Sequence, residues 1–209
     1  WMIHNNPMMR HLKERNNRPS DRNVQVSRRE WSALNESNFE CSCCGFQSAP
    51  TQEVPSGYME VFVNSKDEHF VLCSICATSK KLGRQVSGSN NHGLILHVTN
   101  LEQSHVSNVA RITCTSLISS LPYAKAAQNL ISQFQHMQAT KKDYLFLTDT
   151  GSVIQTVTAL TSIRANKMEE ASSIFKHLKY FPSKAEYRHI FKYWHQINPD
   201  YFTPPPSLT

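Results

Sequence analysis

Two pairs of cysteines carry the clearest chemical signal in this 209-residue sequence. Cys41 and Cys44 are separated by two residues in CSCCGFQ, and Cys73 and Cys76 have the same spacing in CSIC. A spacer of two residues lets one tight turn direct both sulfurs at the same ion, and four thiolates form a closed tetrahedral sphere. The spacing therefore predicts one Zn²⁺ bound by Cys41, Cys44, Cys73 and Cys76. Because no coordination position remains for a water molecule, we expect the metal to be structural and not catalytic.

Two other interpretations of these cysteines stay open. Cys43 could replace Cys44 in a slipped register, although the spacing favours Cys44 and leaves Cys43 as a free thiol or a neighbour of the metal site. Disulfides would require an oxidising compartment, yet the N-terminus is polar and lacks the apolar core of a secretory signal. We therefore favour zinc over disulfides.

The segments around the cysteines predict a small metal-binding unit. Gly45 follows the first pair, where such a turn commonly needs a residue that tolerates positive φ. Residues 58–63 and 69–72 are rich in strand formers and flank a polar turn, which predicts a hairpin. A helix is expected to begin near Ala77, just after the second pair. Thiolate turn, hairpin, thiolate turn and helix is the order of a treble-clef or ββα-metal unit.

Other elements are predicted on both sides of this unit. A short helix over 27–35, with Trp31 and Leu34 on one side, is expected to lead into the first thiolate turn. Residues 82–93 are rich in Gly, Ser and Asn and predict a loop, and residues 94–98 predict one more short strand.

Beyond residue 98 the apolar periodicity becomes that of a helix. Thr99 with Glu102 and Ser183 with Glu186 predict capping boxes, and Asn166 with Glu169 predicts the start of another helix. Residues 144–147 and 153–163 suit a strand or a helix, and we favour a helix for the second. The predicted buried stripes have spacings of three and four residues: Val106, Ala110, Cys114, Leu117 and Leu121; Ala127, Leu130, Ile131, Phe134 and Met137; Met168, Ala171, Phe175 and Leu178; and Tyr187, Ile190, Phe191, Trp194 and Ile197, with Lys184, Arg188 and Lys192 opposite.

Composition and the positions of helix-breaking residues divide the chain into three parts. Residues 1–25 are predicted to be a basic, disordered arm, residues 26–197 a single domain, and residues 198–209 a proline-rich tail. The metal unit would occupy about residues 36–98 of the domain and a mostly helical part residues 99–197. The net charge of +6 permits contact with nucleic acid, anionic lipid or an acidic protein. No apolar run approaches the roughly 18 residues of a membrane span, so we expect no direct membrane insertion.

With these residues considered, the chain resembles the IcmJ/DotN family of type IVB secretion systems, which also occurs in I-type conjugation systems. The resemblance lies in CxxCGFQ at 41–47, CxxCA at 73–77, AQNLISQF at 127–134 and FPSKAEYRHIFKYW at 181–194. These segments follow the family's order and cover about residues 30–197. CxxC pairs alone are generic, whereas the third and fourth segments are more specific.

The resemblance implies both a fold and a role. The fold is α+β: a zinc-stapled ββα-metal unit similar to HNH endonucleases, embedded in a mostly helical remainder, with Cys41, Cys44, Cys73 and Cys76 as the zinc ligands. The role is that of a structural adaptor in the cytoplasmic coupling complex beside the inner membrane. Its implied partners are the C-terminal extension of the DotL-like coupling ATPase and other adaptors of that complex.

An HNH-like unit also invites a nuclease hypothesis, which the sequence does not favour. That chemistry needs a histidine on the first strand of the hairpin to activate water, and the strand has Tyr58, Met59, Glu60 and Val61. Ala77 stands where nuclease relatives commonly have a further histidine. His69, His92 and His97 lie elsewhere and are expected to be surface or packing residues. We expect no enzymatic activity, and rank nucleic-acid binding without catalysis as the alternative function.

Overall fold

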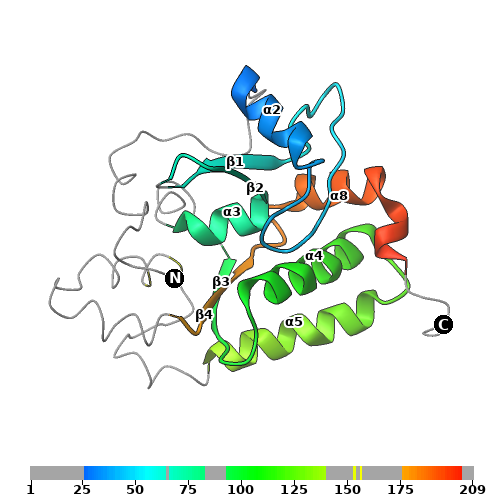
Figure 1. The fold of residues 1–209 in the computed structure, drawn as a ribbon. Coiled ribbons are helices and arrows are strands. Elements are labelled where there is room, and N and C mark those ends of the chain that lie inside the picture. Colours follow the sequence, from blue (N-terminus) through cyan, green and yellow to red (C-terminus); the bar gives the residue numbers. More distant parts are fainter. Residues whose placement is uncertain are drawn as a thin grey trace, which may run out of the picture.

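The computed structural model describes residues 26–64, 66–82, 93–139 and 176–203, together with Val153 and Thr156. Figure 1 shows its helices and strands, which form an α+β arrangement with two separate two-stranded antiparallel sheets. The described elements are α2 (Arg28–Glu36), β1 (Met59–Val63), β2 (His69–Cys73), α3 (Ser74–Lys80), β3 (Gly93–His97), α4 (Gln103–Ser119), α5 (Ala124–Ala139), β4 (Leu178–Pro182), α8 (Arg188–Ile197) and the 3₁₀ helix η6 (Pro199–Phe202).

The N-terminal elements follow the sequence prediction closely. Ser27 caps α2 in a complete capping box: its hydroxyl accepts the Glu30 N–H, and the Glu30 carboxylate accepts the Ser27 N–H. The hairpin forms with Met59 opposite Cys73 and Val63 opposite His69. One boundary was wrong, because α3 begins at Ser74 and not near Ala77. The helix therefore starts directly at the end of β2, and Cys76 lies in its first turn.

The second sheet contains a strand that the sequence prediction missed. Leu178 was expected on a helix but is the first residue of β4, which pairs antiparallel with β3 from His97↔Leu178 to Gly93↔Pro182. All five β4 residues are buried, so the strand has no polar alternation. Gly93 has φ +117, and a Cβ there would lie 2.3 Å from the Phe181 carbonyl oxygen. Only glycine lets the two strands approach so closely.

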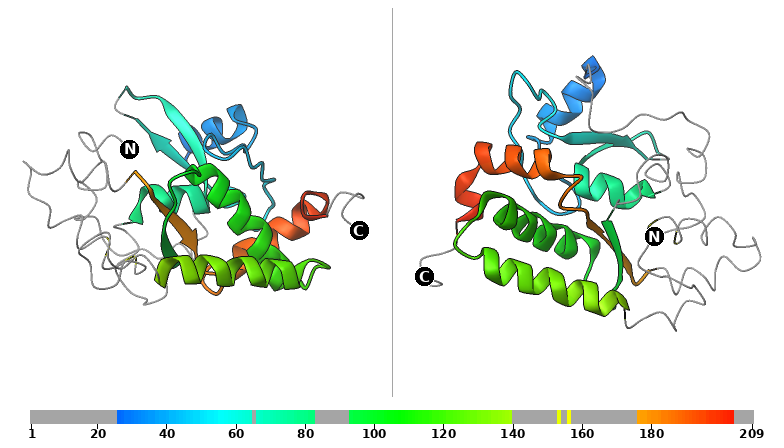
Figure 2. Two further views of the ribbon diagram at one scale, coloured as in Figure 1. Left: turned by 90° about the horizontal axis from the view of Figure 1, so that it is seen from below. Right: turned by 180° about the vertical axis from the view of Figure 1, so that it is seen from behind.

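Helix α4 is the central element of the second half. It contacts α5, α8, β4 and α3, and it lies between α8 and α5 in Figures 1 and 2. Its apolar stripe is confirmed at Val106, Ala110 and Cys114, each fully buried. The capping box predicted at Thr99 is wrong, because the helix begins at Gln103 after Glu102, which makes no side-chain cap. Instead, the Gln103 side chain donates to the Tyr180 carbonyl and accepts the Tyr180 N–H, both at 2.8 Å, and so fixes the helix start against β4.

Two C-terminal boundaries also differ from expectation. Ser183 accepts the Glu186 N–H at 3.5 Å, yet the residues between them form turns and α8 begins only at Arg188. The predicted apolar face is nevertheless confirmed, since Phe191 and Trp194 are fully buried. The expected tail is ordered over its first residues as η6, in which Phe202 is 2% exposed. The packed part of the chain therefore extends beyond residue 197.

A continuous apolar core joins the hairpin, α3, α4 and α8. Phe46 from the first thiolate turn meets Trp194 of α8 edge to face, with ring centroids 4.9 Å apart. A smaller cluster of Leu82, Ile95, Val153, Leu178 and Tyr180 lies at the β3–β4 sheet. The metal unit and the helical part thus share their main core, and neither buries its apolar face without the other.

Several predictions fall outside the described residues: the arm over 1–25, the loop over 83–92, the segment 144–147, the helix start at Asn166 and the tail from residue 204. Within 153–163 only Val153 and Thr156 are described, and both are helical and buried. None of the helices in the described ranges combines the length and the hydrophobicity that crossing a bilayer requires.

Candidate metal centre

The structure brings four of the six cysteines together. The sulfurs of Cys41, Cys44, Cys73 and Cys76 all lie within 4.8 Å of one another. A tetrahedral Zn²⁺ with sulfur ligands at about 2.3 Å requires sulfurs separated by about 3.8 Å. The Cys44 and Cys73 sulfurs are 3.8 Å apart, which matches that spacing and is far beyond the length of a disulfide. The residues therefore fit a four-thiolate metal site.

Backbone hydrogen bonds shape the turn that carries the first pair. The Cys41 N–H donates to the Phe46 carbonyl at 2.9 Å, and the Gly45 N–H donates to the Cys41 carbonyl at 2.8 Å. Gly45 adopts φ +70, as the sequence predicted. The Ser42 N–H donates to the Val71 carbonyl, which fastens the turn to β2. Cys41 and Cys44 consequently face the end of β2, where the second pair begins.

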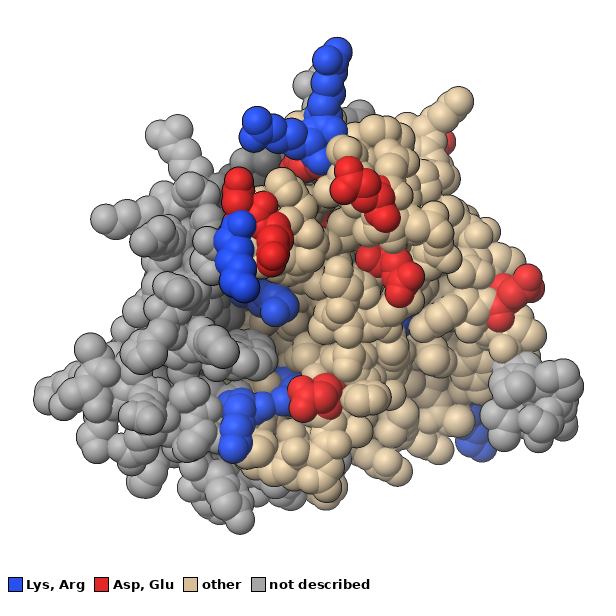
Figure 3. Space-filling model, in the orientation of Figure 1, with Lys and Arg blue, Asp and Glu red and all other residues tan. Residues whose placement is uncertain are grey.

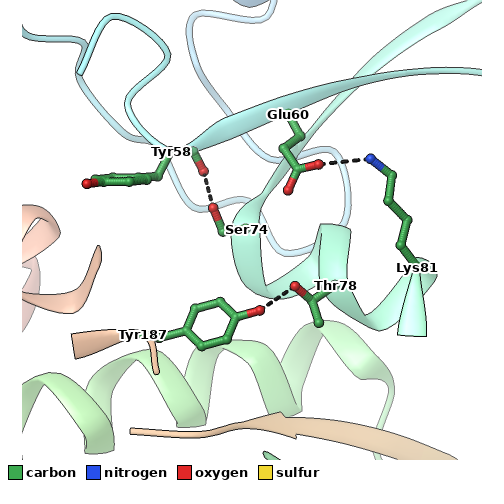
Figure 4. Close-up of polar contacts among 6 residues, drawn as sticks. All are labelled: Tyr58, Glu60, Ser74, Thr78, Lys81 and Tyr187. Carbon is green, nitrogen blue, oxygen red and sulfur yellow. Dashed lines mark hydrogen bonds and ion pairs between the residues drawn. The ribbon is translucent and has the colours of Figure 1, made fainter. Parts of the chain in front are cut away.

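The second pair lies at the junction of β2 and α3. Cys73 ends the strand and precedes the helix, and Cys76 follows within the first helical turn. The Ser74 N–H and hydroxyl both donate to the Tyr58 carbonyl, and Figure 4 shows the hydroxyl contact. This double contact holds the strand-to-helix junction against the start of β1.

Two further contacts in Figure 4 fasten α3. Thr78 and Tyr187 share a short buried hydroxyl contact that joins the helix to the segment before α8. Lys81 lies 2.8 Å from the Glu60 carboxylate and also covers the Phe62 ring. The helix that carries Cys76 is thus held from β1 on one side and from the C-terminal segment on the other.

Cys43 and Cys114 do not belong to the four-sulfur group. Cys43 is half-buried beside it, as expected if Cys44 supplies the ligand. Cys114 lies fully buried on α4, where burial raises the pKa of its thiol to about 12. It therefore stays a neutral core residue, in agreement with the apolar stripe in which it was predicted.

The electrostatics of the group favour a thiolate at Cys44. The pKa of Cys44 is held well below its usual range, chiefly because its sulfur accepts a hydrogen bond from Cys41 and then from Cys73 and Cys76. Arg111 adds a positive charge beside it. Burial has the opposite effect on Cys73 and raises its pKa. The donor set can thus hold negative charge, which is the form that binds a metal ion.

Polar side chains of α4 complete the surroundings of the sulfurs, and the sequence prediction missed them. Ser107 Oγ lies 3.3 Å from Cys76 Sγ, the Asn108 amide donates to the Cys44 carbonyl, and Arg111 donates to two sulfurs. Ser107 and Arg111 each follow a residue of the predicted apolar stripe. The predicted stripe corresponds to a narrow buried face. The buried face of α4 is wider and also includes Ser107, Arg111 and Thr115.

The sequence is similar to that of one curated relative with a named role. It is 18% identical to "Type 4 apparatus protein DotN" of Legionella pneumophila over 166 residues, which span 79% of this chain and 77% of that protein. No family model matches the sequence. The similarity agrees with the resemblance drawn from the sequence motifs, and at this identity it suggests a relationship.

Proposed function

We propose that this protein is a structural adaptor subunit of a type IVB secretion coupling complex. In this role it binds the C-terminal extension of the coupling ATPase and helps to assemble the platform that receives substrates. The observation that carries the proposal is the similarity to DotN, a type 4 apparatus protein, over more than three quarters of both chains. Such an adaptor would work in the cytoplasm and reach the inner membrane through the complex.

In this proposal the metal is a structural Zn²⁺ held by Cys41, Cys44, Cys73 and Cys76. The four-sulfur geometry supports it, since four protein ligands leave no position for an activated water. The ion would join the first thiolate turn to the β2–α3 junction. Its contribution is to keep the hairpin and α3 in the arrangement on which α4 and α8 pack.

The histidines support a role without catalysis. The β1 strand MEVFV contains no histidine. His69 lies opposite Val63, at the far end of the hairpin from Cys73, and the four residue steps between His69 and Cys73 span about 13 Å. A general base must reach its proton within hydrogen-bond distance, so His69 is poorly placed to serve a site near the sulfurs.

Nucleic-acid binding is the competing function, and the net charge of +6 and the basic sequence of residues 1–25 favour it. On the face shown in Figure 3, the described Lys and Arg side chains alternate with Asp and Glu and form no continuous basic surface. Phosphate binding would need such a surface and would weaken steeply with salt. We therefore keep it as the alternative outcome of the test.

The test is a pull-down of the full chain with the C-terminal extension of the coupling ATPase from the same organism, at 50 mM and at about 300 mM salt. We expect stoichiometric capture at both concentrations, because apolar contacts between an adaptor and a peptide depend far less on salt than phosphate contacts do. Cys73→Ser should abolish capture by destroying the metal site. Cys43→Ser is the matched control, since it removes a neighbouring thiol outside the four-sulfur group and should bind like the wild type.

Two results would count against the proposal. Absence of capture at both concentrations, by a chain that contains its metal, would reject the adaptor function. If the same chain were retained on a duplex DNA column at 50 mM salt and released at about 300 mM, nucleic-acid binding would replace it.

A further inference from the structure

Arg111 is a fully buried cation, and among the residues that the structure describes no carboxylate forms an ion pair with it. Its side chain has 0% relative exposure at the centre of α4. Within the described ranges the ion pair found is Lys81 with Glu60, on the other side of α3. Burying a guanidinium costs several kcal/mol unless an opposite charge and hydrogen-bond acceptors surround it. The position of Arg111 therefore requires a source of negative charge inside the protein.

The sulfurs of the metal centre are placed to supply that charge. One terminal nitrogen, Nη2, donates to Cys44 Sγ at 3.1 Å and to Cys73 Sγ at 3.3 Å. The two sulfurs come from different CxxC pairs, so a single nitrogen bridges the two halves of the centre.

The other terminal nitrogen, Nη1, and the plane of the guanidinium also have close neighbours. Nη1 donates to Asn108 Oδ1 at 2.5 Å and to the Tyr201 hydroxyl at 3.3 Å. The group lies 3.9 Å from the centroid of the Phe46 ring and 5.4 Å from that of Trp194. Phe46 belongs to the first thiolate turn, Trp194 to α8 and Tyr201 to η6. Arg111 is thus the point at which the metal centre and the C-terminal segment meet.

We infer that Arg111 is the counter-cation of the metal centre and positions its two halves. Four thiolates around a divalent ion leave a double negative charge, which one guanidinium reduces to a single one. Hydrogen bonds from Nη2 stabilise the lone pairs of Cys44 and Cys73, so they make these thiolates less reactive and harder to strip of metal. The inference rests on the metal site of the proposed function and does not depend on the ATPase partner.

The test uses Co²⁺ in place of zinc in the full chain, with the variants Arg111→Met, Arg111→Lys and Cys114→Ala. Met fills the apolar volume without the donors or the charge. Lys keeps the charge but cannot bond two sulfurs and Asn108 at once. Cys114→Ala is the matched control, because it creates a comparable defect in the core face of α4 without touching the four sulfurs.

Arg111→Met should move the sulfur-to-cobalt charge-transfer bands to lower energy, because thiolates that lose a hydrogen bond release electrons more easily. The same variant should lose its metal to a chelator about 10- to 100-fold more readily than the wild type, as measured by competition. Arg111→Lys should recover part of the chelator resistance and little of the band shift. Cys114→Ala should leave the bands unchanged even where it lowers the unfolding temperature.

Two outcomes would overturn the inference, and a third would separate it from the adaptor function. If Arg111→Met has the same charge-transfer bands and the same chelator resistance as Cys114→Ala, the role of Arg111 is rejected, and the four-thiolate centre is not. A wild-type chain that takes up no metal would reject the four-thiolate centre as well. If Arg111→Met shows the expected band shift while the wild-type chain fails to capture the ATPase extension, the adaptor function is rejected and the inference is supported.

Discussion

The metal unit and the helical part of this protein encode their structures over very different sequence distances. In the metal unit, both cysteine pairs, the hairpin and α3 lie within Cys41–Lys80, and each element follows from its own residues. The strand of the helical part, β4, instead pairs with β3, from which α4 and α5 separate it in the sequence. The four cysteines are therefore local in sequence while the residues that surround them are not, since Arg111 and Tyr201 both come from the second region.

The largest expected effect breaks the metal unit itself. Cys73→Ser should lose the ion. The loss should lower the free energy of unfolding by on the order of 10 kcal/mol, which is comparable with the whole stability of a domain. Because Phe46 and Trp194 share one core across the two regions, we expect the helical part to lose its structure in the same step. Zinc analysis and far-ultraviolet circular dichroism, with and without a chelator, measure both changes.

Cys43→Ser provides the control for that experiment and should keep one ion per chain. A Cys73→Ser chain that lost zinc but kept a cooperative helical transition would show that the two regions are independent. Loss of zinc from Cys43→Ser together with its retention in Cys44→Ser would assign the ligand to the slipped register.

The second prediction compares two tryptophans, one at the junction of the regions and one at the edge. Trp194 has 0% exposure, contacts the Phe46 and Phe191 rings and donates to the Gly57 carbonyl. Trp194→Ala should lower the free energy of unfolding by about 3–5 kcal/mol, because it opens a cavity between the metal unit and α8. Trp31 is 42% exposed and meets Phe39, so Trp31→Ala should cost about 1 kcal/mol or less.

Urea denaturation monitored by circular dichroism measures this difference. Equal losses for the two variants would mean that the junction contributes no more than an edge contact. A shared core would then be the wrong description of how the two regions are joined.

The third prediction compares the glycine of the first thiolate turn with the glycine of the β3–β4 sheet. Gly93→Ala should destabilise the protein by roughly 1–3 kcal/mol, because its Cβ would lie 2.3 Å from the Phe181 carbonyl oxygen at φ +117. Gly45→Ala should cost about 1 kcal/mol, since its φ of +70 is strained for alanine but the nearest atom, in the Glu40 side chain, is 4.0 Å away.

Denaturant midpoints of the two variants, compared at equal zinc content, test this ranking. A larger loss for Gly45→Ala would place the tighter backbone constraint in the thiolate turn, and not in the β3–β4 sheet.

The parts of the fold that could be predicted from the sequence are those with local causes. The Ser27 capping box, the hairpin strand formers and the apolar face of α8 each act within a few residues. Strand β4 could not be found in this way, because LKYFP has no alternation and its register depends on a distant partner. The late start of α4 likewise follows from the contact of Gln103 with Tyr180.

In the candidate site, too, the residues with local causes could be predicted and the others could not. CxxC spacing identified the four cysteines, since a turn of that length converges two sulfurs without help from the rest of the chain. Arg111 could not be recognised, because an arginine on a helix is ordinarily a surface residue. Its burial follows only from the packing of α4 between the thiolate turn, α8 and η6.

The pairing of β3 with β4 also sets an order of events during synthesis. Leu178 leaves the ribosome about 80 residues after His97, which at synthesis rates of about 5–20 residues per second is a delay of several seconds. All four cysteines and the hairpin have been made before that delay begins. A nascent chain can therefore bring its four cysteines together while the apolar segment Gly93–His97 still has no strand to pair with.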